Sequence, residues 1–445
     1  MRKNLLLMLL AALMLASCGN KKDQTKFEMP AVEDIVMYQV NPRVFAPEKS
    51  LQAVTARLDS IKALGVNVVW VMPIYPIGKE KTKNSPYSIS DYKAVNPEFG
   101  TLDDFKALVD SCHAKGMGII LDWVANHTAW DNVWLKEGHK DWYTKDSTGN
   151  IVAPIPDWSD VADLNYDNKD MRRAMIDAMK FWVTEMGVDG FRCDVADMVP
   201  TDFWKEAISE LRKAAGDRRL VMLAEGTKVE NFTEGGFDMN YAWDFMHALF
   251  GVMDGDDVSA LIKADSAEYA VLPEGKVKLR FTTNHDESTH GTPVTMFGNP
   301  EAAMAAYVVT TTLHGGALIY GSQEVDQPDS INFFHYVPVD WTSNQDTYHN
   351  FQQFFRIYNE HPALRKGELK PIYAKDGVIM YEKKLKNDRY LVFANLHQGD
   401  KVVIDIPEDW VGIKACNLLH LEEIWDMHPQ LPLNSYNYFI LKRMD

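Results

Sequence analysis

Residues 187–194 read GVDGFRCD and residues 221–225 read VMLAE, and these two stretches decide the predicted fold. In each, a short apolar run ends directly on a carboxylate, Asp194 in the first and Glu225 in the second. Short apolar runs of this kind are typical of strands buried on both faces, as in a parallel sheet. The amphipathic stretch Met171–Glu185 precedes the first run and has the apolar spacing of a helix. Together these patterns indicate alternating strands and helices.

The alternation extends from about residue 34 to 365. Eight strands are expected: Ile35–Val40, Val66–Val71, Gly118–Leu121, Gly190–Cys193, Val221–Ala224, Met239–Trp243, Arg280–Thr283 and Ala317–Tyr320. Helical patterns such as Thr101–Lys115 lie between them. Eight strands alternating with helices predict an α/β fold, a (β/α)₈ barrel over residues 31–365.

Two regions depart from the alternation. Residues from about 128 to 168 hold Trp, Pro, Asp and Gly in irregular order, which predicts a short inserted loop domain after the third strand. Residues 366–445 alternate apolar and polar positions between Gly, Asn and Asp turns, as in DRYLVFANL. That alternation predicts a C-terminal antiparallel β-sandwich.

The first residues predict export. Residues 1–17 have a basic start and a short apolar stretch, as in a signal peptide, and LASC at 15–18 resembles the lipoprotein cleavage box. We expect Cys18 to be lipidated, residues 18–30 to form a tether, and the protein to be anchored to the cell envelope. The periplasmic or cell-surface face of the outer membrane is the expected location. An ordinary secretory signal with a chance cysteine is the alternative.

The composition limits the classes of molecule that the protein is expected to bind. With 46 Lys and Arg against 63 Asp and Glu, the formal charge is −17, which disfavours nucleic acid. Four cysteines are too few for a disulfide scaffold in 445 residues. Three of them, Cys112, Cys193 and Cys416, would remain in the mature chain, and their scatter predicts free thiols. The sequence carries no ATP or NAD signature, and it leaves the oligomeric state open.

Carboxylates follow four of the expected strands: Asp122, Asp194, Glu225 and Asp286. Loops at the carboxyl ends of barrel strands converge over one mouth, where barrel enzymes place their reactive groups. A single terminal Asp could merely cap the next helix. Four such groups, accompanied by Arg192, His127 and His285, instead predict one active site.

The motifs around these residues resemble the α-amylase family of glycoside hydrolases, over nearly all of the chain after residue 30. The four regions that carry the resemblance are DWVANH at 122–127, GFRCD at 190–194, LAE at 223–225 and FTTNHD at 281–286. A further stretch, ADLN at 162–165, stands where the family has an auxiliary region in its inserted loop.

The resemblance implies a role for each site residue. Asp194 would be the nucleophile, Glu225 the acid/base, and Asp286 a third carboxylate that grips sugar hydroxyls. Arg192 lies two residues before Asp194 on the same strand, so it projects to the same side and is expected to hold that carboxylate ionised. His127, His285 and Asp122 would contact the same sugar. Either histidine could instead be a satisfied structural residue.

An aromatic residue is expected beneath the sugar. Tyr87 lies in SPYSISDY at 85–92, which is similar to the family stretch that places a tyrosine against the sugar at the cleaved bond. A pyranose ring offers an apolar C–H face to such a ring. Four tryptophans are open as further platforms or as core residues: Trp123, Trp130, Trp158 and Trp243.

Two positions depart from the starch-degrading members. Asp197 and Met198 stand where those members often have Lys-His, which leaves bond and chain-length preference open. Family members often bind calcium through the asparagine that corresponds to Asn126. Acids at positions 157, 160, 163 or 167 could contribute, but the insert has no EF-hand-like loop. No cofactor is expected to be required, and calcium is left open.

The resemblance predicts a retaining hydrolase that cleaves α-1,4-glucosidic bonds in starch, maltodextrins or related α-glucans through a covalent glycosyl-enzyme. The separation of the two carboxyl groups would be about 5–5.5 Å. An α-1,6-acting or transglycosylating enzyme is an alternative within the same family. A non-catalytic glucan-binding relative is a third hypothesis, which would predict that one of the three carboxylates is missing.

Overall fold

The structure is a computed structural model that describes residues 27–399, 401–420 and 423–444. The expected signal peptide, the lipidation site Cys18 and most of the tether lie outside these ranges. Within them, no helix is both long enough and apolar enough to cross a membrane.

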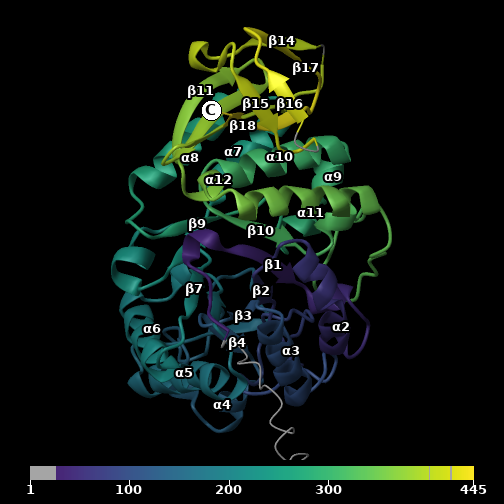
Figure 1. The fold of residues 1–445 in the computed structure, drawn as a ribbon. Coiled ribbons are helices and arrows are strands. Elements are labelled where there is room, and N and C mark those ends of the chain that lie inside the picture. Colours follow the sequence, from purple (N-terminus) through teal and green to yellow (C-terminus); the bar gives the residue numbers. More distant parts are fainter. Residues whose placement is uncertain (1–26, 400, 421–422, 445) are drawn as a thin grey trace, which may run out of the picture.

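Eight parallel strands close into a barrel at the centre of the molecule (Figure 1). In chain order they are β1 (Val36–Val40), β2 (Val68–Val71), β3 (Gly118–Trp123), β6 (Gly190–Cys193), β7 (Val221–Ala224), β8 (Met239–Tyr241), β9 (Val277–Arg280) and β10 (Gly316–Tyr320). Around the barrel the order is β1-β10-β9-β8-β7-β6-β3-β2, so sequential strands are neighbours. Nearly every barrel residue is buried, as two covered faces require. The predicted barrel is confirmed.

Several strand boundaries differ from the sequence prediction: β2 begins two residues later, and β8 ends at Tyr241 because Trp243 begins α7. Two further differences affect the site. The seventh strand of the barrel, β9, ends at Arg280 and lies three residues earlier than expected. Residues Phe281 to His285 therefore form a buried loop, and Asp286 comes after this loop instead of directly after the strand. The third strand, β3, continues to Trp123, which places Asp122 inside it. The stretch Phe281-Thr-Thr has the composition of a strand, which explains the error. Its threonines are buried, but they lie in the loop after β9.

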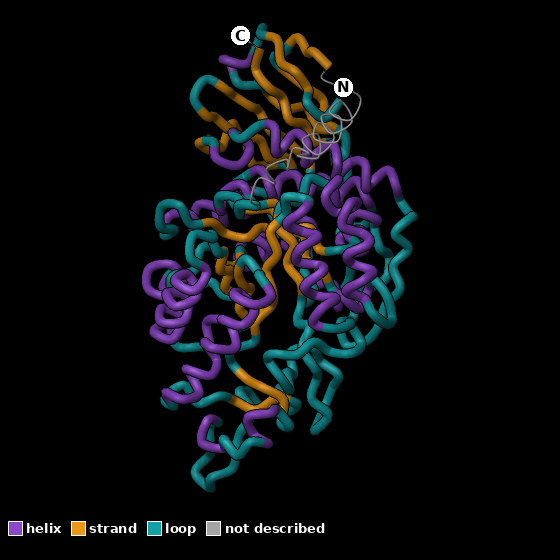
Figure 2. The backbone as a smooth tube through the Cα atoms, turned by 60° about the horizontal axis from the view of Figure 1, so that its bottom comes forward, coloured by secondary structure: helices purple, strands orange, loops and turns teal. Residues whose placement is uncertain are grey.

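Helices surround the barrel on the outside (Figure 2). The longer ones are α2 (Ser50–Ala63), α3 (Leu102–Ala114), α5 (Lys169–Phe181), α6 (Thr201–Ala215), α7 (Trp243–Met253), α8 (Ser259–Ala270), α10 (Pro300–Thr312) and α11 (Gln345–Glu360). Helix α3 begins where Thr101 accepts from the N–H of Asp104 and Asp104 accepts from the N–H of Thr101. This reciprocal cap satisfies donors that the first turn leaves free.

The segment after β3 folds away from the barrel. Strand β4 (His127–Ala129) pairs antiparallel with β5 (Val161–Asp163), and the short helix α4 (Val133–Lys136) lies between them. The crossover helix α5 begins at Lys169. The excursion therefore returns to the barrel mouth, with residues 154–161 above it.

The C-terminal part is antiparallel, as its alternation predicts. A six-stranded sheet has the order β11 (Glu368–Lys375), β12 (Val378–Leu385), β13 (Asp388–Asn395), β18 (Tyr438–Met444), β15 (Lys414–Asn417), β16 (Glu423–Asp426). A ribbon of β14 (Val402–Asp405) and β17 (Gln430–Leu433) packs on it through a core that includes Phe393, Trp410 and Leu441. Figure 1 shows this domain above α10 and α12 (Ala363–Lys366).

A buried lysine lies between the two domains. Lys383 of β12 is fully buried and donates to the carbonyl oxygen of Leu313, just after α10. Beside it the hydroxyl groups of Tyr381 and Thr312 are 2.6 Å apart. Burial lowers the pKa of Lys383 to about 7. The C-terminal sheet is thus joined to the barrel by polar contacts inside an apolar interface.

Candidate active site

One buried arginine holds three carboxylates at the barrel mouth. Nη1 of Arg192 lies 2.9 Å from Oδ1 of Asp122 and 2.9 Å from Oδ1 of Asp194. Nη2 lies 2.9 Å from Oε1 of Glu225. Arg192 and Asp122 are fully buried, and Asp194 and Glu225 are nearly so. Such a planar guanidinium can pair several carboxylates at once.

The strand register explains this convergence. Asp122 of β3 and Arg192 of β6 are paired across the ladder, so their side chains point to the same face. The ladder continues past the strands, because the N–H of Asp194 donates to Trp123 and the N–H of Glu225 donates to Cys193. Both carboxylates therefore stand at one level, directly after the last paired residues of β6 and β7.

A cavity of about 400 Å³ opens above these carboxylates. Six of the predicted residues line it: Tyr87, His127, Asp194, Glu225, His285 and Asp286. Asp122 and Arg192 lie beneath, in contact with Asp194 or with Tyr87. The structure thus brings all eight predicted catalytic and sugar-binding residues together, Asp122 and Arg192 from strands β3 and β6 and the others from segments after β2, β3, β6, β7 and β9.

A hydrogen-bonded chain fixes the floor of the cavity. Nε2 of Gln39 lies 2.8 Å from Nδ1 of His285, and Nε2 of His285 lies 2.6 Å from Oη of Tyr87. Tyr87 in turn donates to Oδ2 of Asp122 at 3.2 Å. This order assigns the proton of His285 to Nε2, because the amide of Gln39 can only donate to Nδ1. The rings of Tyr87 and His285 are stacked, with centroids 5.4 Å apart.

The two histidines are neutral. Burial lowers the pKa of His127 to about 4 and, together with the charge of Arg192, the pKa of His285 to about 3. Nδ1 of His127 lies 3.2 Å from the side-chain nitrogen of Asn126, which places the ring proton on Nε2. The ring also hydrogen-bonds to the backbone of Tyr87. Both rings are therefore neutral and line the cavity, and the two nitrogens of His285 are bonded to Gln39 and Tyr87.

The carboxylates repel one another more than one arginine compensates. Burial, followed by the charge of Glu225, raises the pKa of Asp194 well above its usual value, and Arg192 only moderates the effect. Burial likewise raises the pKa of Asp122 to about 6. Arg192 is paired with Asp194 and lowers its pKa, as expected, but burial and the neighbouring carboxylates outweigh this effect.

Asp286 occupies the rim of the cavity. Its side chain is 41% exposed, and Oδ2 lies 3.5 Å from Nε2 of His285. The buried Asn284 fixes this turn, because its Oδ1 accepts from the backbone N–H groups of Asp286 and Glu287 at 2.9 and 3.0 Å. Asp286 is thus held in place by its backbone while its carboxylate faces open space.

Calcium binding at Asn126 stays a prediction, because calcium would bind the side-chain oxygen of Asn126 and the contacts below involve other atoms. Its side-chain nitrogen is taken by His127, and Asp160 faces Lys83, whose Nζ lies 3.5 Å from Oδ1. Within the part of the chain that the structure describes, no group of three or more His, Cys, Asp or Glu side chains is placed to hold a metal ion.

The aromatic residues divide into cavity and core. Of the four candidate tryptophans, Trp158 lines the cavity, and its ring lies edge-on to His127 at 5.5 Å. Trp123 is fully buried, Trp243 packs against Tyr241, and Trp130 lies under Lys81. Phe333 and Phe334 also line the cavity but were not anticipated, because their long loop after β10 carries no periodic pattern.

Asp197 braces the loop that follows Glu225. Its Oδ2 accepts from the N–H of Thr227 at 3.0 Å, and Oδ1 accepts from the side chain of Asn231 at 2.8 Å. Gly226 is required here, because a Cβ at that position would lie 2.3 Å from Oδ1 of Asp197. Asp197 therefore connects the segments after β6 and β7.

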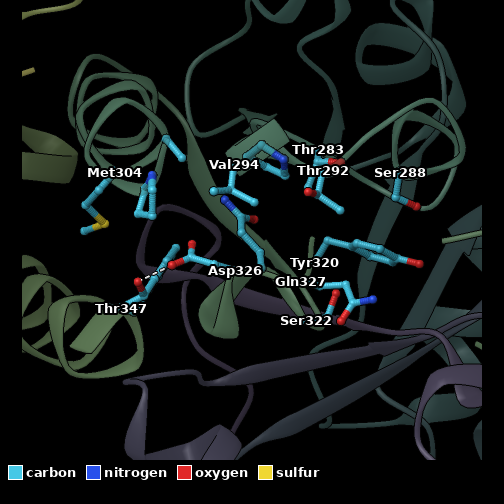
Figure 3. A pocket seen from close by; sticks show the side chains of 15 residues that line it. Thr283, Ser288, Thr292, Val294, Met304, Tyr320, Ser322, Asp326, Gln327 and Thr347 are labelled. Atoms are coloured by element: carbon cyan, nitrogen blue, oxygen red, sulfur yellow. Dashed lines mark hydrogen bonds between the residues drawn. The ribbon is translucent and has the colours of Figure 1, made fainter. Parts of the chain in front are cut away.

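A second, much smaller cavity of about 20 Å³ lies beside the end of β10, lined mainly by apolar atoms (Figure 3). Tyr320 and Ser288 lie at one end, and the hydrogen-bonded pair Asp326 and Thr347 lies at the other. A space of this size holds a water molecule at most. The 400 Å³ cavity is the candidate active site because the predicted carboxylates and histidines line it.

Comparisons with known proteins identify a family for the chain. Residues 39–368 match the family model of the alpha amylase catalytic domain. The α-amylase MalA of Haloarcula japonica is 29% identical over 391 residues, which are 83% of this chain and 56% of MalA. The chain thus spans little more than half the length of that relative.

Two further relatives differ in their named activities. A probable oligo-1,6-glucosidase 2 of Bacillus subtilis is 32% identical over 204 residues, or 38% of this chain and 35% of that protein. The crystal structure of the maltogenic α-amylase AmyB of Thermotoga neapolitana superposes with a TM-score of 0.84 at 27% identity. That superposition covers 94% of this chain and 100% of the other.

Proposed function

Because the chain belongs to the alpha-amylase family, as an α-amylase-type glycosidase, we propose that it is a retaining hydrolase of α-1,4-glucosidic bonds. Its substrates would be starch, maltodextrins or related α-glucans. The observation that carries the proposal is the placement of Asp194 and Glu225 on the two terminal nitrogens of Arg192, each at 2.9 Å. Retaining enzymes need two carboxyl groups about 5–5.5 Å apart, close enough for one to bond to the sugar.

In the first step the carboxylate of Asp194 forms a bond to the anomeric carbon as the glycosidic C–O bond breaks. Glu225 gives its proton to the departing oxygen, so no unprotonated alkoxide leaves. Burial raises the pKa of Asp194, but the reaction requires this group to be ionised and the acid/base residue to carry a proton. That proton must reside on Glu225 when the bond breaks.

In the second step water attacks the anomeric carbon and gives its proton to Glu225. The ester bond to Asp194 breaks, and Arg192 stabilises the carboxylate that returns. Two inversions restore the α configuration. Both steps pass through a positively charged sugar, which the acidic surroundings of the cavity favour.

The remaining side chains would orient the sugar. Tyr87 offers a ring that is fixed by His285, and the neutral rings of His127 and His285 line the same cavity. Asp286 presents a carboxylate at the rim that can accept from two neighbouring hydroxyls. These contacts set the reacting carbon in line with Asp194.

An α-1,6-acting or transglycosylating enzyme is the second candidate. It is favoured by Asp197 and Met198, which replace the Lys-His of starch-degrading members on the leaving-group side, and by the name of the B. subtilis relative. A non-catalytic glucan-binding protein is disfavoured, because Asp194, Glu225 and Asp286 are all present and converge.

The test is product analysis. The purified protein is incubated with maltoheptaose, panose, pullulan and cyclodextrins, and the products are separated by chromatography while NMR follows the new anomeric centre. Release of α-configured products from maltoheptaose supports the proposal, and Asp194→Asn should abolish it. Initial β-configured products, or hydrolysis of the α-1,6 bond alone, would contradict it.

We also propose that the protein is exported and lipid-anchored through Cys18, on the motif at residues 15–18. Cells grown with a labelled fatty acid should label the wild type but not Cys18→Ser. Equal labelling of both would contradict this.

A further inference from the structure

Three barrel loops are tied together across the mouth from Glu225. Around the closed barrel, β10, β1 and β2 are consecutive, and β1 lies directly opposite β7, the strand that carries Glu225. The loops after β10 and β2 supply Phe333, Phe334 and Lys83 to the cavity. We call these three residues, with Arg43 and Asn84 behind them, the far wall.

Arg43, just after β1, fastens the loops on both sides of it. Nη1 donates to the carbonyl oxygen of Phe333 and to that of Asn84, each at 2.9 Å. The same guanidinium is held by Glu98 at 2.7 Å, and Arg43 is 2% exposed. Asn84 adds a direct link, because its side-chain nitrogen donates to the carbonyl oxygen of Phe334 at 2.5 Å. Charge-assisted bonds in so buried a setting make this part of the wall rigid.

Lys83 continues the wall to the inserted segment. Its Nζ donates to the carbonyl oxygen of Asp157 at 2.9 Å and lies 3.5 Å from Oδ1 of Asp160. The side chain of Lys83 is 48% exposed, whereas that of Asp160 is 10% exposed. The bridge therefore spans the gap between the loop after β2 and the insert, and it is the weakest link of the wall.

The far wall stands on the glycone side of the site. Phe333 lies against Tyr87 and His285, with ring centroids 5.8 and 5.6 Å apart, and these two residues form the floor under the reacting sugar. Glu225, which serves the leaving group, lies across the mouth. Chain units beyond the reacting sugar toward the non-reducing end would therefore run into the wall, whereas the leaving-group side faces away from it.

We infer that the far wall closes the cavity at the glycone end, so that the cavity is a pocket with one open end. Lys83 completes this closure. The enzyme would then act on the non-reducing ends of α-glucans and release short units, instead of cutting within a long chain. A volume of about 400 Å³, near the lower end for ligand pockets, is in keeping with a short segment of sugar. This inference rests on the proposed function, since it assigns the direction of the chain from the roles of Asp194 and Glu225.

The test compares two forms of maltoheptaose, one free and one with its non-reducing glucose capped by a 4,6-O-benzylidene acetal. The wild type should cleave the free form and should cleave the capped form at least about 100-fold more slowly. Lys83→Ala should raise the capped-to-free ratio about tenfold or more, because it opens the wall. Lys79→Ala is the matched control, an exposed lysine of the same loop that does not line the cavity.

Thermal unfolding of both variants should match the wild type, because both side chains reach solvent. Equal cleavage of the capped and free forms by the wild type would overturn the inference and leave the proposed function intact. Failure to cleave either form would instead contradict the proposed function. A ratio unchanged by Lys83→Ala would overturn the role given to Lys83.

Discussion

The backbone N–H of Val195 donates to Oε2 of Glu225 at 2.7 Å, so the residue that follows Asp194 holds the carboxylate of the neighbouring strand. Val195 has φ 36° and ψ 47°, a left-handed conformation that a β-branched residue rarely adopts. The next residue continues the clamp, because the N–H of Ala196 donates to the carbonyl oxygen of Glu225 at 2.9 Å. Backbone strain of this kind is found where a functional group must be held.

Replacement of Val195 should separate stability from activity. Val195→Gly removes the steric cost of the left-handed conformation, so the unfolding temperature should stay equal or rise. The freed backbone would hold Glu225 less firmly, and kcat/KM should fall about tenfold, or about 1.4 kcal/mol. Calorimetry and steady-state kinetics on maltoheptaose check this. A variant that loses stability and activity in parallel would show that Val195 acts only through packing.

The turnover that Glu225→Gln retains should depend on the leaving group of the substrate. The variant cannot protonate a departing sugar oxygen, so turnover of maltoheptaose should fall about 10²–10⁴-fold. Turnover of α-glucosyl fluoride, whose leaving group needs little protonation, should fall far less. Asp194→Asn is the matched comparison and should lose both substrates, because the nucleophile itself is missing. Equal losses for Glu225→Gln on both substrates would remove its role as acid.

Tyr87→Phe isolates the hydroxyl group from the ring. The variant keeps the stacked face but loses the bonds to His285 and Asp122, at 2.6 and 3.2 Å. We expect kcat/KM to fall about five- to tenfold, since one buried hydrogen-bonding partner contributes about 1 kcal/mol. Tyr87→Ala should cost considerably more and should raise KM. If both variants behave alike, the ring is not a sugar platform.

The buried histidines should make the protein less stable in acid. Folding lowers the pKa of His285 from 6.5 to about 3, so the unfolded chain binds a proton that the folded chain does not. Stability from this group is fully present above pH 6.5 and is lost as the pH falls toward 3. Each such histidine adds a slope of about 1.4 kcal/mol per pH unit between these limits.

His285→Asn should therefore flatten the pH dependence of unfolding between pH 6 and 4, measured with urea, relative to the wild type. The exposed His335→Asn is the control and should leave the slope unchanged. An equal slope in His285→Asn and the wild type would mean that His285 is protonated in the folded protein.

Asp197→Ala should loosen the loop after Glu225. It removes the acceptor for Thr227 and Asn231, and it should lower the free energy of unfolding by about 1–3 kcal/mol and also lower kcat. Asp202→Ala, an exposed acid at the start of α6, is the control and should change either quantity little. Unchanged kcat in Asp197→Ala would limit its role to stability.

The sequence predicts the barrel because most strands are short apolar runs with clear ends. Asp194 and Glu225 directly follow β6 and β7, so the motif and the strand end coincide. Strand β9 shows where such prediction fails. Phe281-Thr-Thr has the composition of a strand, but β9 ends at Arg280 and these residues form a loop at the barrel mouth. Tertiary contacts outweigh local propensity there.

The far wall could not be predicted from the sequence. Lys83, Asn84 and Phe333 lie in loops without periodicity. The bond of Arg43 to Phe333 joins residues 290 positions apart, and that of Asn84 to Phe334 joins residues 250 positions apart. The net direction of the pKa shift of Asp194 was missed for a related reason. Sequence places Arg192 beside it, but only the folded structure shows that Asp122 and Glu225 share the same cation.

Lys383 couples the attachment of the C-terminal sheet to the acidity of the medium. Separation of the two domains would return its amine to water, where it binds a proton up to a pKa of 10.5, whereas the joined form releases that proton at about 7. Association therefore expels a proton, and it should tighten by about 1.4 kcal/mol for each pH unit between these values. A fragment that ends before β12 would lack this amine. Any contact it kept with the barrel would therefore not become stronger as the pH rises from 7 to 10.5.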